Sequence, residues 1–179
     1  MNKGSKVIIC DKSPTDAAND YAWQTDLELA HLTATHLPAT DFADYLSNYN
    51  RQLRYHLPGK KNFSIKTRGG KHIGNCTCCN INETKGDAEI GIIIGDRRYW
   101  DKGYGTDAVN YLVDYIFENS SVVRIYLKTL ASNKRAQKCF TKCGFAVCGQ
   151  IISSGNRYFL MELHHNRRRQ HTESEEKPL

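Results

Sequence analysis

The chain has 179 residues, of which 40% are hydrophobic and 25% are charged, and its formal net charge is +6. This length suits one compact domain, because domains most often contain ~100 to 150 residues. The first five residues are polar and lead into a short apolar run. The sequence thus offers neither a signal peptide nor a spanning segment of ~20 apolar residues, and we expect a cytoplasmic protein without a membrane partner.

The first part of the chain predicts a strand followed by helices. Residues 6–10 form a short strand-like run, and Ser13-Pro14 after it is typical of a helix start. Apolar spacing over residues 14–54 predicts a pair of helices or a helix-loop-helix, the second beginning at Thr40-Asp41. Residues 11–50 also hold seven acidic side chains against Lys12 alone, which suits a cationic partner.

The middle of the chain changes to a strand-like period. Residues 63–66 alternate, residues 68–71 give a hairpin turn, residues 73–81 stay extended, and residues 88–94 form a third run. The same region has a basic window, residues 51–82, with seven basic side chains and no acid. Such a window suits an anionic partner, so a nucleic-acid-binding module with Tyr55 and Phe63 as stacking groups is one alternative.

The last part predicts alternating helices and strands. Residues 103–119 and 133–143 have helical spacing, residues 122–130 read as a buried strand, and residues 145–152 and 158–163 as a hairpin. Gly144 closes the second of these helices. Residues 164–179 are polar and are predicted to be a disordered tail.

The seven cysteines do not indicate disulfides or metal. An odd number without an export signal is typical of reduced thiols. Cys76, Cys78 and Cys79 lack a second cysteine pair at zinc-site spacing, and strand alternation separates Cys79 from the other two. We therefore predict no metal site.

The stretch from Ile92 to Ala108 carries the chemistry, since it runs from a strand through a glycine loop into a helix. Glycines at 103 and 105 leave amide N–H groups free to surround an anion, such as a pyrophosphate, at the positive end of the helix dipole. The stretch lacks the lysine of a P-loop and the third glycine of a dinucleotide fingerprint.

Trp100-Asp-Lys-Gly-Tyr-Gly-Thr-Asp-Ala108 closely resembles the coenzyme A-binding loop of the GNAT superfamily of N-acetyltransferases, particularly its RimJ/RimL-like branch. Residues 133–145, from Asn-Lys-Arg-Ala to Gly-Phe, resemble the family's next motif, and Glu89 lies on the strand before the coenzyme loop. The resemblance covers roughly residues 6–163 and implies an α/β (α+β) GNAT-like domain over residues 1–163. It implies a mixed, mostly antiparallel sheet of about seven strands flanked by about four helices.

The resemblance also implies acetyl-CoA as cosubstrate and a set of residues that contact it. Backbone amides of residues 101–106 would hold the pyrophosphate, residues 92–94 would follow the pantetheine arm, and Asn133 would bond to it or serve as a plain N-cap. The implied coenzyme contacts are Ile92, Ile93, Ile94, Arg98, Trp100, Asp101, Lys102, Gly103, Tyr104, Gly105, Thr106, Asn133, Arg135, Ala136 and Phe140.

Two positions depart from the family pattern. Trp100 stands where Gln or Arg is usual, so help to the phosphate would fall to Arg97, Arg98 or Lys102. Phe140 stands where many members have a tyrosine that protonates the leaving thiolate. Tyr104, Cys139, another hydroxyl or water would have to do so.

The implied activity is direct transfer of an acetyl group to a primary amine, either a small cationic amine or a peptide N-terminus. Glu89 is the candidate base, and the alternative is a plain solvent-facing strand glutamate. A backbone N–H near Ile93 or Ile94 would polarise the carbonyl. A sensor that binds acetyl-CoA without transfer is a second alternative, and a second copy of the chain is kept open as a partner.

Overall fold

The computed structural model describes residues 6–55, 59–166 and 168. Its centre is a seven-stranded sheet in the order β1-β2-β3-β4-β5-β7-β6. All neighbouring strands are antiparallel except β4 and β5, which are parallel. The strands are β1 (Val7–Asp11), β2 (Lys61–Thr67), β3 (His72–Asn82), β4 (Asp87–Ile94), β5 (Arg124–Leu130), β6 (Ala146–Ser153) and β7 (Asn156–His164). The predicted fold class is confirmed.

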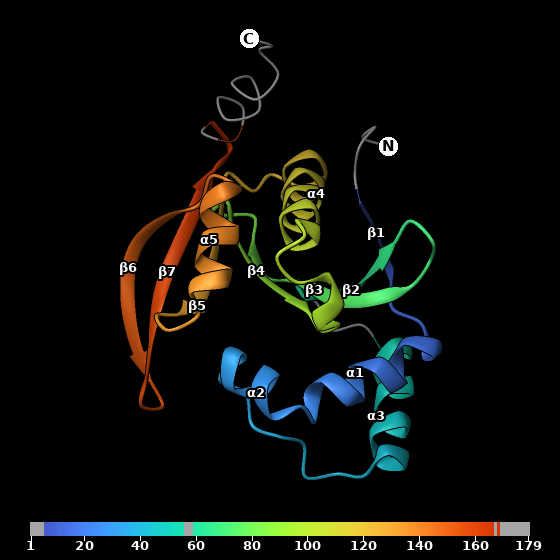
Figure 1. The fold of residues 1–179 in the computed structure, drawn as a ribbon. Helices are drawn as coiled ribbons and strands as arrows, with labels where there is room; N and C mark the ends of the chain where they lie inside the picture. Colours follow the sequence, from blue (N-terminus) through green and yellow to red (C-terminus); the bar gives the residue numbers. More distant parts are fainter. Residues whose placement is uncertain (1–5, 56–58, 167, 169–179) are drawn as a thin grey trace.

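Helices cover one face and one end of the sheet. Figure 1 shows α4 and α5 side by side over one face, while α1, α2 and α3 gather at the end where β4 stops. The described helices are η1 (Pro14–Asp16), α1 (Ala17–Gln24), α2 (Leu27–Thr33), α3 (Phe42–Arg54), η2 (Arg97–Tyr99), α4 (Tyr104–Asn119) and α5 (Lys134–Lys142).

The region 14–54 contains three α-helices instead of the expected pair. The Asp26 side chain accepts a hydrogen bond from the Leu29 N–H and so caps a new helix two residues after α1 ends. The apolar spacing that predicted the first helix of the pair therefore belongs to α1 and α2 together. None of the helices within the described ranges is long and apolar enough to cross a membrane.

The main core lies between α4 and the sheet. The predicted apolar stripe of α4 is buried, namely Ala108, Val109, Leu112, Val113, Ile116 and Phe117. It packs on strand residues such as Ile65, Ile73, Ile125 and Leu127, each about 1% exposed or less. Each such side chain contributes roughly 1.5–3 kcal/mol by burial, so this layer holds α4 firmly beside β4.

The cysteines are all free thiols. Burial raises the pKa of Cys76 to about 12 and that of Cys78 to about 11, while Cys79 on the other face is only half-buried. The alternation predicted for this strand is confirmed. In the part of the chain that the structure describes, no group of three or more His, Cys, Asp or Glu could hold a metal ion.

The predicted tail, residues 164–179, lies mostly outside the described residues. Within the described part, β7 continues to His164, and Arg168 Nε donates to Asp114 Oδ1 of α4 at 2.9 Å. This contact joins the end of the described chain to α4.

Candidate functional site

The loop between β4 and α4 has an unusual backbone. Asp101 and Gly103 both have left-handed φ angles, 55° and 82°. Gly103 is the N-cap residue of α4, and no side chain caps this helix. The N–H groups of the first turn therefore point out of the helix end without a side-chain acceptor, and with the helix dipole they favour an anion there.

The role of Gly105 is to lack a side chain, because its backbone conformation does not require glycine. A Cβ at this position would lie 3.5 Å from Cys139 Sγ and 3.7 Å from Ile94 Cγ1, which are ordinary contacts, and its φ is not in the left-handed region. The surrounding protein would accept a methyl group. A side chain at 105 would occupy part of the cleft, which Gly105, Cys139 and Ile94 all line.

β4 and β5 separate next to this helix end. Their parallel ladder pairs Asp87 with Arg124, Ala88 with Ile125 and Glu89 with Tyr126, and stops there. Beyond Glu89, one edge of β4 has no strand partner among the described residues, so its peptide groups are open to a ligand. The Ile94 carbonyl is already used, because it accepts a hydrogen bond from Trp100 Nε1 at 2.6 Å.

A cleft of about 260 Å³ occupies the space between β4, the loop, α2 and α5. Twelve of the fifteen predicted coenzyme contacts line it: Ile92, Ile93, Ile94, Trp100, Asp101, Gly103, Gly105, Thr106, Asn133, Arg135, Ala136 and Phe140. The three residue groups that the motifs indicated, on β4, the loop and α5, are thus brought together.

Three predicted contacts lie outside this lining. Arg98 is bound to Asp96, whose carboxylate accepts from Arg98 Nη2 at 2.7 Å, and its side chain is 73% exposed. Lys102 is exposed, and Tyr104 packs edge-on against Tyr99 with ring centroids 4.9 Å apart. Arg97, the other candidate beside Trp100, is held by Asp26 and Glu28 at 2.7 Å each.

At the start of α5, Asn133 caps the helix and Arg135 packs on Trp100 of the loop. Asn133 Oδ1 accepts from the Ala136 N–H at 3.1 Å, so Asn133 is the N-cap, and its Nδ2 donates to the Leu32 carbonyl of α2 at 3.1 Å. The Arg135 guanidinium lies 3.3 Å from the centre of the Trp100 ring. Trp100 therefore holds both the β4 end and a cation at the cleft.

The cleft also has lining residues that sequence reasoning missed, namely Leu29, Leu32, Thr33, Tyr99, Lys138 and Lys142, and it contains Cys139, which the sequence offered as a proton donor. Lys138 and Lys142 follow Arg135 at helical spacing, so the period of α5 could have revealed them. The α2 residues carry no local signal, because their approach to the cleft is set by tertiary packing.

Cys139 is the ionisable thiol of the cleft. A hydrogen bond with the Cys143 thiol lowers the pKa of Cys139, burial raises it, and a hydrogen bond with Thr106 lowers it again, to about 7. The Thr106 Oγ1 to Cys139 Sγ distance is 3.5 Å. A thiol with this pKa can donate a proton near neutral pH.

Glu89 does not line the cleft. It is the last β4 residue paired with β5, and its side chain is 16% exposed. Lys128 Nζ lies 3.2 Å from its carboxylate, and Asn80 Nδ2 donates to it at 2.8 Å. Ala88 and Ile90, its neighbours in sequence, are buried in the core, so Glu89 points to the opposite sheet face at the apex of the β4–β5 fork.

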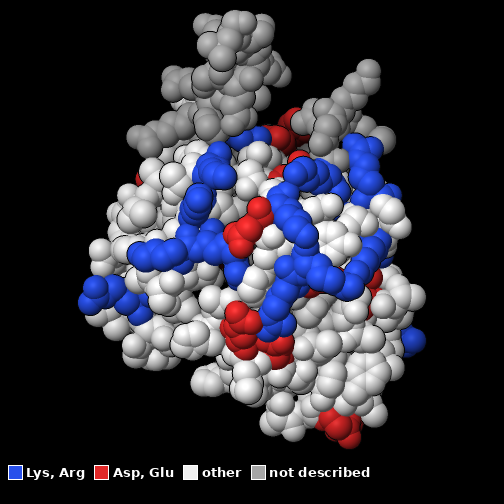
Figure 2. Space-filling view, in the orientation of Figure 1, with Lys and Arg blue, Asp and Glu red and all other residues white. Residues whose placement is uncertain are grey.

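Basic side chains surround the cleft. Figure 2 shows Lys and Arg spread over the face that α4 and α5 present, around shorter acidic stretches. Arg135, Lys138 and Lys142 are the basic residues of the cleft lining. The basic window 51–82 is partly neutralised, because Lys66 pairs with Asp16 at 3.3 Å and Lys71 with Asp96 at 3.1 Å.

Comparisons with known proteins agree with this arrangement. Residues 7–146 match the family model described as acetyltransferase (GNAT) domain. The chain is 36% identical over 73 residues to an uncharacterized N-acetyltransferase p20 of Bacillus licheniformis, covering 41% of this chain and 40% of that protein. It is 26% identical over 115 residues to a spermidine N(1)-acetyltransferase of Vibrio cholerae, covering 64% of this chain and 65% of that protein.

The matched segments thus span about two-fifths to two-thirds of these curated relatives. Among solved structures, spermidine N-acetyltransferase from Vibrio cholerae in complex with CoA and spermine superposes with a TM-score of 0.78 at 20% identity, over 91% of this chain and 98% of that chain. Aminoglycoside acetyltransferase AAC(6')-Ib in complex with coenzyme A gives 0.74 at 19%, over 92% and 98%. These two likenesses concern the fold. Since the family model covers most of the sequence, the chain belongs to the GNAT acetyltransferase domain family.

Proposed function

We propose that the protein is an acetyl-CoA-dependent N-acetyltransferase of the RimJ/RimL-like branch. The observation that carries the proposal is the meeting of an open β4 edge with the uncapped N-terminus of α4 in one cleft. An open strand edge suits the amide groups of a pantetheine arm, and the helix end suits a pyrophosphate. Few ligands other than coenzyme A combine the two.

The coenzyme would be held by backbone and basic groups together. The N–H groups from Asp101 to Thr106 would bind the pyrophosphate, and Arg135 and Lys138 would supply charge at the rim. The pantetheine would follow Ile92 and Ile93, because Trp100 already uses the Ile94 carbonyl. Asn133 would act through α5 and α2 as well as by contact, since both of its polar atoms are engaged.

The reaction needs a neutral amine, a polarised carbonyl and a protonated leaving group. The amine nitrogen attacks the thioester carbon, the C–S bond breaks, and a peptide N–H of β4 stabilises the oxyanion. Glu89 would accept the amine's proton from the far side of the fork, directly or through water. Lys128 and Asn80 keep its carboxylate oriented. Cys139 or water would protonate the thiolate, because Phe140 has no hydroxyl.

The acceptor we propose is a primary amine, either a small cationic amine or a peptide N-terminus. The spermidine and aminoglycoside acetyltransferases among the similar proteins act on such amines. The seven acidic side chains of residues 11–50 are not all available to a cationic acceptor. Asp16, Asp20, Asp26 and Glu28 are ion-paired within the protein, with Lys66, Lys12 and Arg97 among their partners.

An acceptor screen tests this function. Acetyl-CoA labelled in the acetyl group would be incubated with polyamines, aminoglycosides, amino acids and short peptides, and products followed by mass spectrometry. We expect a labelled N-acetyl product from at least one amine class. Binding of acetyl-CoA without any product would favour the sensor instead, and absence of binding would remove both.

We also propose that a second copy of the chain pairs along β6. This edge strand of eight residues has no charged residue and no proline, and Val147, Ile151 and Ile152 on it are exposed. The opposite edge, β1, is short and flanked by Lys6 and Lys12, which protects it from pairing. Sedimentation equilibrium should show a dimer that Ile152→Lys dissociates; a parent that is monomeric at high concentration would contradict this.

A further inference from the structure

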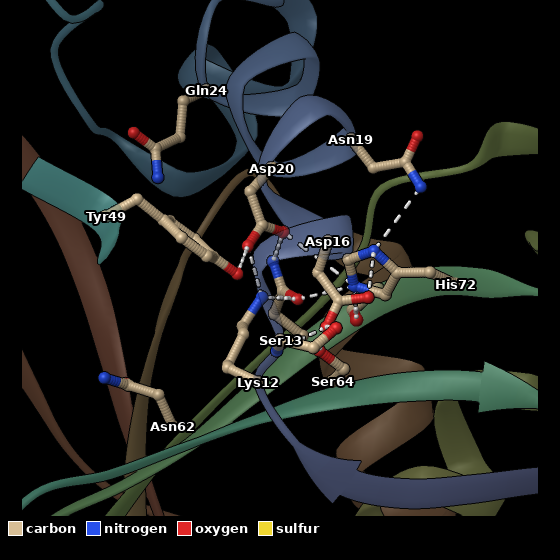
Figure 3. Close-up of polar contacts among 12 residues, drawn as sticks. Lys12, Ser13, Asp16, Asn19, Asp20, Gln24, Tyr49, Asn62, Ser64 and His72 are labelled. Carbon is tan, nitrogen blue, oxygen red and sulfur yellow. Dashed lines mark hydrogen bonds and ion pairs between the residues drawn. The ribbon is translucent and has the colours of Figure 1, made fainter. Parts of the chain in front are cut away.

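A cluster of buried polar side chains stands behind the cleft, on the sheet face that Glu89 shares. Figure 3 shows side chains from the segment after β1, from η1, α1 and α3, and from β2 and β3 pointing toward one another. Asp20 is its centre, because it pairs with Lys12, accepts from Tyr49 Oη at 3.0 Å and accepts from Asn75 Nδ2 at 2.6 Å. The residues that Figure 3 labels in the connected part are Lys12, Ser13, Asp16, Asn19, Asp20, Tyr49, Ser64 and His72.

The cluster fixes α1 on the sheet. Asp16 and Asp20 are only 2% and 3% exposed, and both are fully engaged. Ser64 Oγ donates to Asp16 at 2.7 Å, and the His72 ring nitrogens lie 3.6 Å from Asp16 and 3.8 Å from Asp20. A shift of α1 would separate buried charges from their partners, which is strongly unfavourable. Helix α1 therefore has one well-defined position.

Trp23, near the end of α1, transmits this position to the coenzyme strand. Its ring lies between His72 and Gly95, with the Trp23 and His72 centroids 4.8 Å apart. A Cβ on Gly95 would lie 2.0 Å from Trp23 Cδ2, so the ring contacts the backbone directly. Gly95 follows the last residue of β4, and its N–H donates to the Ile73 carbonyl at 3.0 Å.

The same contact sets the opposite wall of the cleft. Only two residues separate α1 from α2, and α2 supplies Leu29, Leu32 and Thr33 to the cleft lining. Helix α2 is also held by the buried side chain of Leu29, by Arg97 at its first turn and by Asn133 at the Leu32 carbonyl. The Trp23–Gly95 contact adds a close packing contact between the end of α1, just before α2, and the end of β4.

We propose that Trp23 is a positioning residue of the coenzyme cleft, fixing through Gly95 and His72 how closely α2 approaches Ile93 and Ile94. The proposal rests on the proposed function, since it takes the cleft as the coenzyme site. Replacing the Trp23 ring removes its packing contact with Gly95. Adding a methyl group at Gly95 pushes the ring away from β4. Either change displaces the α2 wall and weakens coenzyme binding.

The test is a double-mutant cycle on Trp23→Ala and Gly95→Ala, read as the Kd of coenzyme A by calorimetry. Each single change should raise the Kd by about tenfold or more. In the double variant the methyl group of position 95 fits where the indole was, so the combined loss should be well below the product of the two. Trp23→Phe, which keeps a ring, should recover most of the affinity.

Phe117→Ala is the matched control, because Phe117 is 8% exposed and lies at the far end of α4. It should lower the thermal midpoint without changing the Kd of coenzyme A. If the parent binds coenzyme A and Trp23→Ala binds it with the same Kd, the proposal is wrong. It is also wrong if the Kd of the double variant rises by the full product of the two single increases. If Trp23→Ala does not fold, Trp23→Phe/Gly95→Ala completes the cycle. A parent that does not bind coenzyme A would refute the proposed function itself.

Discussion

The substitution Gly105→Ala should weaken coenzyme binding without lowering the stability of the fold. The backbone at 105 is ordinary, and the new Cβ would meet only Cys139 and Ile94 at 3.5 and 3.7 Å. Alanine also favours the helix over glycine by roughly 0.5–1 kcal/mol. The free energy of unfolding should therefore stay level or rise slightly.

Coenzyme binding should respond in the opposite direction. Gly105 lines the cleft at the uncapped end of α4, where the pyrophosphate would approach the N–H groups. Losing one hydrogen bond to a charged group costs about 1.5–3 kcal/mol, which raises the Kd roughly 10- to 150-fold. Gly105→Val should weaken binding further.

Gly103→Ala provides the contrast. Gly103 has φ 82°, where an alanine costs about 1–2 kcal/mol, so its thermal midpoint should fall by roughly 2–8 °C. Calorimetric titration with coenzyme A and thermal unfolding, run on both variants, give the two readouts. If Gly105→Val binds coenzyme A as tightly as the parent, the assignment of the helix end to the pyrophosphate is wrong.

The remaining predictions concern catalysis and acid stability. Glu89→Gln should lower turnover by ~10²- to 10⁴-fold with coenzyme affinity unchanged; an unaltered pH–rate profile would place the base elsewhere. Phe140→Tyr should change turnover only modestly, whereas a large gain over an inactive parent would support the sensor. Burial raises the pKa of Asp16, but hydrogen bonds from Ser64 and Ser13 and the charge of His72 outweigh it and lower the pKa from 3.8 to about 2. Because the folded pKa is lowered, Asp16 stabilises the fold above pH ~4 by about 2 kcal/mol, and this is lost as the pH falls toward 2. Asp16→Asn should flatten the acid side of the stability curve measured by urea unfolding; an unchanged acid limb would refute this role.

Local motifs predicted three segments that line the cleft. The glycines at 103 and 105 and the run from Asn133 to Phe145 are contiguous in sequence, and their spacing alone fixes a loop, a helix end and a helix face. These features are determined by short-range geometry.

The rest depends on long-range contacts that leave no local pattern. The sequence pattern assigned no role to Trp23, because its approach to Gly95 depends on how α1 packs over the polar cluster. Arg97 looked available to a phosphate, yet two acids of α2, far away in the sequence, hold it. A charge count over residues 11–50 could not reveal which acids are paired within the fold.

The structure of the complex with coenzyme A tests the central claim most directly. We predict the pyrophosphate within hydrogen-bond distance of the N–H groups of Gly103, Tyr104, Gly105 and Thr106, and the pantetheine arm in the gap beyond the Glu89–Tyr126 pair. The thiol end should then face the fork where Glu89 lies. A coenzyme bound elsewhere, or a β4 edge left unoccupied in the complex, would contradict the account.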